Sequence, residues 1–244
     1  MINPTSGDAW YSSAWSNGES RSFLKNNLDP FDNRFGVDHG GSDMEIDGKG
    51  VAILHDKTRL FVQGSWLNTD MQAYFYVPTG VGGVISLRGR SNHKGAFFHQ
   101  NCGFGDYLTR WDLDGKNEVR TGKEPVHPIY TGYSGIKGLV FPKDRWVELR
   151  LVIRNIENDT KVAVDAFTNG EWVSGGIDNN DWPGAPTQGS ELWNKAKDCV
   201  GKGDKILENI SKAFFGRGVH CWLRCDVDGP IKISNFSVRE IAPG

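Results

Sequence analysis

Apolar and polar residues alternate along much of this chain, with the period of two that is typical of half-buried β-strands. The stretch 146–154 shows it best, because apolar residues occupy every second position from Val147 to Ile153 with charged residues between them. The stretch 160–168 repeats the pattern after a short polar corner. Further strands are predicted at 43–47, 50–54, 59–63, 71–77, 83–90, 106–113, 117–123, 219–226 and 231–241.

Short turn sequences separate these stretches. Glycine, asparagine and aspartate adopt the positive φ angles that tight hairpin turns require. Many short strands with such punctuation predict an all-β sandwich of antiparallel sheets and not alternating strands and helices. The turn pairs are Asp47-Gly48, Asp114-Gly115, Asn169-Gly170 and Asp228-Gly229.

One stretch near the C-terminal end breaks the period of two. Ile206, Ile210 and Phe214 stand four apart, which is the spacing of one helix face, and Gly216 follows as a stop signal. We therefore predict one short helical insertion near 190–215, covering one end of the sheets.

No linker or change in composition divides the chain, so we predict a single domain over 1–244. Within it, 1–42 is predicted to be an irregular N-terminal segment that packs on the sandwich. The segment 178–217 is predicted to be a helical and loop insertion.

The composition is compatible with a large buried core, and the net charge argues against nucleic acid as a partner. Hydrophobic residues make up 38% of the 244 residues, and nine Trp and thirteen Phe supply large buried areas. The formal net charge is −2, which disfavours nucleic-acid binding because no basic excess exists to release counterions. We expect a monomer.

Membrane and compartment signals are weak. No apolar run approaches the roughly 20 residues that span a bilayer, so we expect no membrane partner. The N-terminal sequence lacks the charged-then-apolar order of a signal peptide. The compartment stays open: secreted if a leader was removed, and cytoplasmic otherwise.

Four cysteines give little information about disulfides. Cys221 and Cys225 lie in one predicted strand, about 13 Å apart, and cannot bridge each other. We expect both to face the core. Any disulfide would have to involve Cys102 or Cys199.

The candidate chemistry is concentrated between Val84 and Tyr133. With a period of two, Arg88 and Arg90 share one face, and Asp112 and Glu124 could be the acidic partners that pair with them. Two interpretations stay open: a structural ion-pair network, or a clamp for carboxylates and hydroxyls. Further polar and aromatic ligand candidates in this region are His99, Gln100, Tyr107, Arg110, Asp112 and Tyr133.

The segment TGKEPVHPIY holds an inventory for general acid–base chemistry. Lys123 and Glu124 are predicted to face opposite sides of a strand, and His127 and Tyr130 follow within eight residues. His93, at the end of a strand, is a further candidate base. An ordinary surface loop would account for the same histidine next to proline, and this alternative stays open.

Aromatic residues offer platforms on which sugar rings could stack. Tyr74 and Tyr76 share one face of the 71–77 strand, and Trp222 occurs with His220 and an arginine on a later strand. The tyrosines could equally underlie the N-terminal segment.

Oxygen-rich loops could hold a structural calcium ion. They contain Asp29, Asp32, Asn33, Asp43, Glu45 and Asp47. Turn capping explains these residues without an ion, and no EF-hand spacing is present. We expect no required cofactor.

The chain resembles the concanavalin A-like jelly roll shared by laminarinase-type hydrolases, glucuronan and alginate lyases, and carbohydrate-binding domains. The strands RWVELRLVI and IKISNFSVREI, with R-S-N-H and K-E-x-x-H-P, carry the resemblance over nearly the full chain. The laminarinase string E-x-D-x-x-E is missing, and RGRSNH and FFHQN match the alginate lyase strands only loosely. The resemblance therefore implies a jelly-roll sandwich and a glycan ligand, but no catalytic residue.

The leading hypothesis is a polysaccharide lyase that binds an acidic glycan in a concave groove and cleaves it by β-elimination. The alternatives are a glycoside hydrolase that uses Glu124 and Asp112, and a non-catalytic domain that stacks sugars on Tyr74, Tyr76 and Trp222. In the lyase hypothesis the carboxylate is neutralised by Arg88, Arg90, Arg110 and Gln100, the base is His93, His127 or Lys123, and the acid is Tyr130 or Tyr107.

Overall fold

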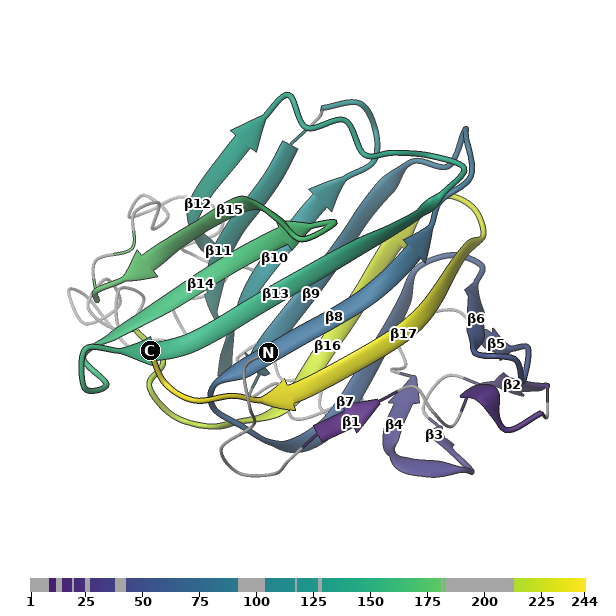
Figure 1. Cartoon of the computed structure of the whole chain (residues 1–244), viewed down its shortest axis with the longest axis horizontal. Coiled ribbons are helices and arrows are strands. Elements are labelled where there is room, and N and C mark those ends of the chain that lie inside the picture. The colour runs from purple at the N-terminus through teal and green to yellow at the C-terminus, as the bar shows by residue number, and fades with distance from the viewer. Residues whose placement is uncertain are drawn as a thin grey trace.

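The alternating segments form two antiparallel β-sheets that stack face to face (Figure 1). The computed structural model describes residues 9–11, 15–18, 20–24, 27–37, 43–91, 104–116, 118–126, 129–180, 182 and 213–244. The predicted helical insertion lies outside these residues, apart from 213–215, which form no regular element.

The first sheet has nine strands, and β1 pairs with β17 beside the main path. Its order is β15 (Glu171–Asp178), β14 (Lys161–Thr168), β13 (Trp146–Ile156), β8 (Thr69–Tyr76), β17 (Ile231–Glu240), β6 (Val51–Leu54), β5 (Met44–Ile46) and β2 (Arg21–Phe23), with β1 at Ala9–Tyr11.

The second sheet has eight strands. Consecutive strands such as β8 and β9, or β16 and β17, lie in different sheets, so the chain crosses repeatedly between the two layers. The order is β12 (Ile129–Lys137), β11 (Glu118–Val126), β10 (Phe104–Asp112), β9 (Gly83–Ser91), β16 (Gly218–Val227), β7 (Thr58–Trp66), β4 (Asp32–Val37) and β3 (Leu28–Asp29).

The core fills the space between the sheets with the apolar half of each alternating strand. Val147, Leu149 and Leu151 of β13 are fully buried, whereas Glu148 and Arg150 between them are partly exposed. This alternation removes one face of each sheet from water and leaves the other face for polar side chains. The prediction of two stacked antiparallel sheets is confirmed.

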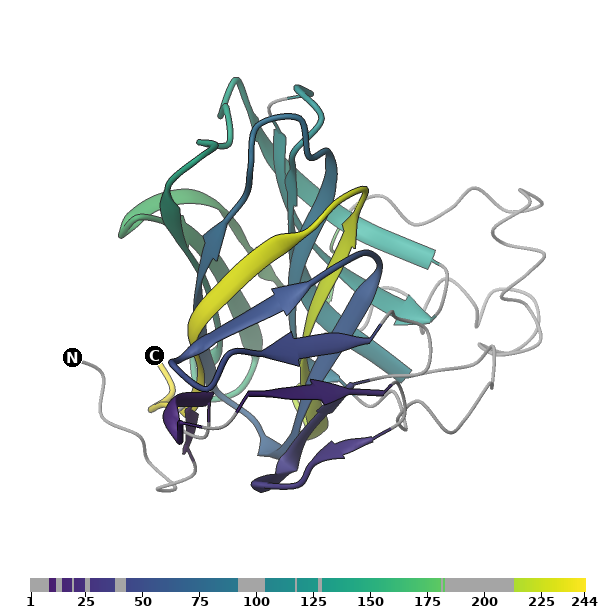
Figure 2. The ribbon, with the colours of Figure 1, turned by 90° about the vertical axis from the view of Figure 1, so that its right-hand side faces the viewer.

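The N-terminal segment differs from its prediction. The sequence suggested irregular structure over 1–42, whereas the described part of this segment forms β1 to β4, which lie together at one end of the sandwich (Figure 2). Trp10 stacks on Phe35, with 5.1 Å between ring centroids, and contacts Trp15 and Phe236 edge-on. These large rings bury enough area to order short strands that alternation alone does not reveal.

The cysteine prediction is confirmed in part. Cys221 and Cys225 are both free thiols in β16, and both are buried in the core. Burial raises the pKa of each thiol well above its ordinary value, so both act as small apolar side chains. Cys102 and Cys199 lie outside the described residues.

The oxygen-rich loops hold their own backbone. Asp29 accepts a hydrogen bond from the amide of Phe31, and Asp47 accepts bonds from the amides of Lys49 and Val51. These are the turn-capping contacts that the sequence offered as the alternative to calcium. Among the described residues, no group of three or more His, Cys, Asp or Glu side chains could hold a metal ion. In the same part of the chain, no helix is long and apolar enough to cross a membrane.

Candidate functional site

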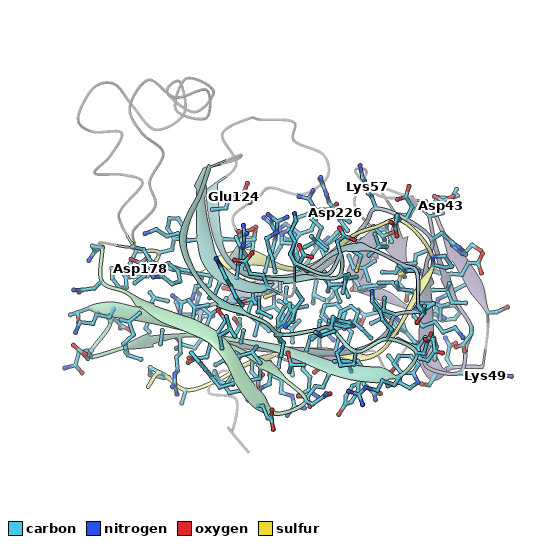
Figure 3. All side chains as sticks on the ribbon, turned by 90° about the horizontal axis from the view of Figure 1, so that it is seen from above. Asp43, Lys49, Lys57, Glu124, Asp178 and Asp226 are labelled. Atoms are coloured by element: carbon cyan, nitrogen blue, oxygen red, sulfur yellow. The ribbon has the colours of Figure 1, made fainter. Side chains whose placement is uncertain are left out.

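The outer face of the eight-stranded sheet carries five of the residues that the sequence singled out: Arg88, Arg110, Asp112, Glu124 and Trp222. On β9, Leu87 points into the core, so Ser86 and Arg88 lie on the opposite face. The register places Arg88 between Trp222 of β16 and Leu108 of β10. Figure 3 shows the strand that carries Glu124 bending upward at one end of this face. Arg88, Arg110 and Trp222 therefore lie on the same face of neighbouring strands.

A row of four arginines crosses this face. Strand pairing aligns Arg59 of β7 with Arg224 of β16, and then continues through Ser86 of β9 to Arg110 of β10 and Arg120 of β11. Because neighbouring strands lie about 5 Å apart, the row extends over roughly 19 Å. Sequence analysis named Arg110 as a ligand candidate and noted Arg224 beside Trp222, but it did not find the row, because the cross-strand register is not visible in the sequence.

Two arginines of the row form ion pairs with carboxylates on their own strands. Arg224 Nε lies 2.7 Å from Asp226 Oδ2, and Arg120 pairs with Glu118. Both pairs join side chains two residues apart on one strand, and their arginines are partly exposed. Exposed pairs of this kind contribute little free energy, so a ligand carboxylate can compete for these guanidinium groups.

Three aromatic rings lie next to the arginine row. Phe61 of β7 packs against His220 and Trp222 of β16, and each pair of ring centroids is 5.5 Å apart. Phe61 and Trp222 are buried and form the floor, whereas His220 is half-buried. The indole nitrogen of Trp222 is buried without a hydrogen-bond partner among the described residues.

A buried cluster of three charged groups lies on this face beside the aromatic rings. Asp106 of β10 stands directly opposite Glu124 of β11, and Arg88 Nη1 lies 3.2 Å from Asp106 Oδ2 and also bonds Glu124. All three side chains are buried, and within the described part of the chain these contacts join two carboxylates to one guanidinium. Burial, opposed by Arg88 and assisted by Glu124, raises the pKa of Asp106 to about 7. Asp106 can therefore hold a proton near neutral pH.

Asp106 was missed by sequence analysis, which paired Glu124 with Asp112. Asp112 lies six residues further along β10, about 20 Å from the position opposite Glu124, and there it accepts a hydrogen bond from the amide of Asp114. That distance does not support the predicted pair. The signal for Asp106 was present, because it stands two and four residues before Leu108 and Arg110 on the same face.

Arg90 does not share the surface of Arg88. Its φ of 54° breaks the alternation of β9, opposite a register shift in β16. The guanidinium bonds the carbonyl of Leu67, the carbonyl of Phe214 at 2.8 Å and Asn68 Oδ1 at 3.1 Å. Burial lowers its pKa to about 10. Arg90 ties loops to the end of the sheet and is not available as a carboxylate clamp.

Lys123 and Tyr107 point into the sandwich. Lys123 Nζ lies 2.6 Å from Asp178 Oδ2 of β15, and the Tyr107 hydroxyl donates to the same oxygen at 2.9 Å. All three groups are buried, and burial raises the pKa of Tyr107 well above its ordinary value. This cluster joins the two sheets. The prediction that Lys123 and Glu124 face opposite sides is confirmed, which places Lys123 away from the outer face.

Tyr74 and Tyr76 lie on the other side of the molecule. Both are half-buried on the outer face of the nine-stranded sheet, where Tyr76 packs 5.8 Å from Trp146. β8 and the arginine-bearing β9 are consecutive along the chain but belong to different sheets. They therefore cannot stack a sugar that contacts Arg88.

The structure describes no side chain for the other six candidate residues. His93, His99, Gln100 and His127 lie outside the described residues. Tyr130 and Tyr133 belong to β12, which pairs with β11, and only their backbone is described.

Comparison with known proteins concerns the fold. No protein-family model and no curated protein sequence matches the chain. A Bacillus subtilis protein of unknown function with a galectin-like fold aligns over 100% of both chains, with 9% identity and a TM-score of 0.53. The chain has a galectin-like jelly-roll fold. The predicted fold class is thereby confirmed.

Two other solved structures align less closely. A carbohydrate-binding module from Bacillus subtilis, CBM66, shares 10% identity over 89% of this chain and 99% of its own, with a TM-score of 0.48. An endo-1,3-beta-glucanase from Streptomyces sioyaensis shares 8% identity over 81% of this chain and 78% of its own, with a TM-score of 0.44.

Proposed function

We propose that the protein binds an acidic glycan across the outer face of the eight-stranded sheet. The observation that carries the proposal is the row of four arginines that runs beside Phe61, His220 and Trp222. Sugar rings combine apolar C–H faces with hydroxyls, so they suit an aromatic floor next to charged donors. Uronate carboxylates would add charge-assisted bonds to the guanidinium groups.

Gel retardation tests this proposal. We expect alginate, glucuronan or pectate in a native gel to slow the protein more than a neutral β-glucan does, and added salt to weaken the effect. Arg110→Ala should reduce the retardation. Lys232→Ala, which removes an exposed cation from the opposite face, is the matched control and should not. Equal loss in both variants, or no retardation by any acidic polymer, would refute the proposal.

Hydrolysis is the second candidate, favoured by the Asp106–Glu124 pair. Side chains directly opposite on antiparallel strands have Cβ atoms about 4.5–5.5 Å apart. Retaining glycosidases hold their two carboxyls about 5–5.5 Å apart, one protonated and one ionised. The raised pKa of Asp106 fits the acid, and Glu124 would be the nucleophile. Hydrolysis requires substrate access to two buried carboxyl groups, whereas a glycan can bind the partly exposed arginines of the row without it, so binding comes first.

Product analysis separates binding, hydrolysis and elimination. New reducing ends without ultraviolet absorbance from an unsaturated uronate would support hydrolysis, and Asp106→Asn and Glu124→Gln should each then lower turnover by about 10²-fold or more. A rise in absorbance would instead support β-elimination. Of the groups predicted for elimination, Lys123 and Tyr107 face the core and Arg88 already pairs with two carboxylates. Retardation with neither signal would support binding alone.

A further inference from the structure

A second aromatic pocket lies on the opposite side of the sandwich. The outer face of β13, β14 and β15, which run side by side in Figure 1, carries a pocket of about 320 Å³. No residue of the arginine row, of the three aromatic rings beside it or of the two buried charged clusters lines this pocket. The side chains that define it are Arg154 and Ile156 of β13, Asp165 of β14, and Trp172 and Ile177 of β15, with Gly175 between the last two.

Trp172 is held in place although it is largely exposed. Its side chain is 53% exposed, yet its indole nitrogen donates a 3.0 Å hydrogen bond to Asp165 Oδ1. Gly175 pairs with Asp165 across the strands, and a Cβ at Gly175 would lie 3.0 Å from the same indole nitrogen. The missing side chain therefore lets the edge of the ring approach the sheet. An aromatic ring fixed at one edge and open to water is a preorganised stacking surface.

The polar groups of the pocket are only partly engaged with each other. Arg154 Nη2 lies 3.9 Å from Asp165 Oδ2, which is too long for a hydrogen bond. Arg154 Nε is buried and has no hydrogen-bond partner among the described residues. The site thus offers a guanidinium donor and a carboxylate acceptor at the edge of the aromatic ring.

Apolar side chains complete the rim. Ile177 is 51% exposed and Ile156 is half-buried, both next to the pocket. One cation and one anion leave the pocket without net charge. An aromatic surface, an apolar rim, one donor and one acceptor match the apolar face and hydroxyl edge of a neutral sugar ring.

We propose that this pocket is a second glycan site, which binds one neutral sugar residue with its C–H face on Trp172 and its hydroxyls on Asp165 and Arg154. The proposal shares its ligand class with the proposed function but depends on different residues. With two sites on opposite faces, one protein molecule could bind two polysaccharide chains, or two segments of the same polysaccharide chain.

Calorimetric titration of the protein with laminarin and with cello-oligosaccharides tests the second site. Trp172→Ala should weaken binding of these neutral glycans by about two- to tenfold, the range expected for loss of an aromatic contact. Trp146→Ala is the matched control, because Trp146 is also exposed on β13 but lies outside the pocket. Thermal unfolding should change little in either variant.

Arg110→Ala separates the two proposals. If Arg110→Ala abolishes acidic-polymer binding while Trp172→Ala changes no affinity, the second site is refuted and the proposed function stands. If Trp172→Ala weakens neutral-glycan binding and Arg110→Ala changes the affinity for no glycan, the second site stands and the proposed function is refuted. A dimer of the wild type that Trp172→Ala converts to monomer, without glycan binding, would assign the pocket to a second copy of this chain and overturn the inference.

Discussion

Lys123 and Glu124 are neighbours on β11, but the buried clusters around them differ in charge balance. On the inner side, one cation, Lys123, meets one anion, Asp178. On the outer side, one cation, Arg88, meets two acids, Asp106 and Glu124. A balanced buried pair has no net charge, whereas a second carboxylate nearby raises the pKa of the first and favours its protonated form. The inner cluster therefore joins the two sheets as a paired unit, whereas the outer cluster raises the pKa of Asp106.

The largest expected effect comes from breaking the inner pair. Lys123→Met leaves Asp178 as an uncompensated buried charge, and we expect the free energy of unfolding to fall by about 3–5 kcal/mol. Urea denaturation at neutral pH measures it. Lys161→Met, which removes the partly exposed pair with Glu157, is the control and should cost less than about 1 kcal/mol. Equal losses in the two variants would mean that the inner pair does not stabilise the fold.

The pH dependence of stability should report the outer cluster. The pKa of Asp106 rises from 3.8 to about 7 on folding, so between these values the folded state holds a proton that the unfolded state has released. Stability should therefore fall as pH rises through this window, with a slope of up to about 1.4 kcal/mol per pH unit, and level off above pH 7.

Urea denaturation at several pH values measures this slope, and Asp106→Asn is the variant that should flatten it. A wild-type slope that survives in Asp106→Asn would assign the proton to a different group. A flat wild-type profile would show that Asp106 stays ionised.

Restoring charge balance in the outer cluster should lower the pKa of Asp106. Glu124→Gln removes the second negative charge that helps to raise it, so Arg88 then faces a single carboxylate. Carboxyl ¹³C NMR titration measures the change. Glu118→Gln, on the same strand and face but six residues away, should leave this pKa unaltered. An unaltered value in Glu124→Gln would show that burial alone sets it.

The sequence predicted strands well where one face is buried. The alternation in 146–154 became β13, and the same period placed Lys123 and Glu124 on opposite faces. A strand after Asn169-Gly170 was missed, although both residues adopt the positive φ values, 51° and 80°, of a tight hairpin turn. That turn signal could have revealed β15.

Cross-strand neighbours and breaks in alternation could not be predicted. Asp106 meets Glu124, and Arg59 meets Arg224, through a register that depends on tertiary pairing. Arg90 leaves its predicted face because its backbone is left-handed, a conformation that arginine rarely adopts. The sequence therefore named strands of the candidate site, but not the cross-strand partners within it.

The smallest expected effect is that of replacing Asp112, which lies on β10 with Asp106 but outside the outer cluster. Asp112 accepts one exposed hydrogen bond in a turn, so Asp112→Ala should cost at most about 1 kcal/mol of stability and leave the pKa of Asp106 unchanged. Denaturation and the same NMR titration measure both quantities. If Asp112→Ala also changed the pKa of Asp106 or abolished glycan cleavage, residues beyond Arg88, Asp106 and Glu124 would contribute to the electrostatics of the outer cluster. The contrast between the two sides of β11 would then have to include the whole outer face.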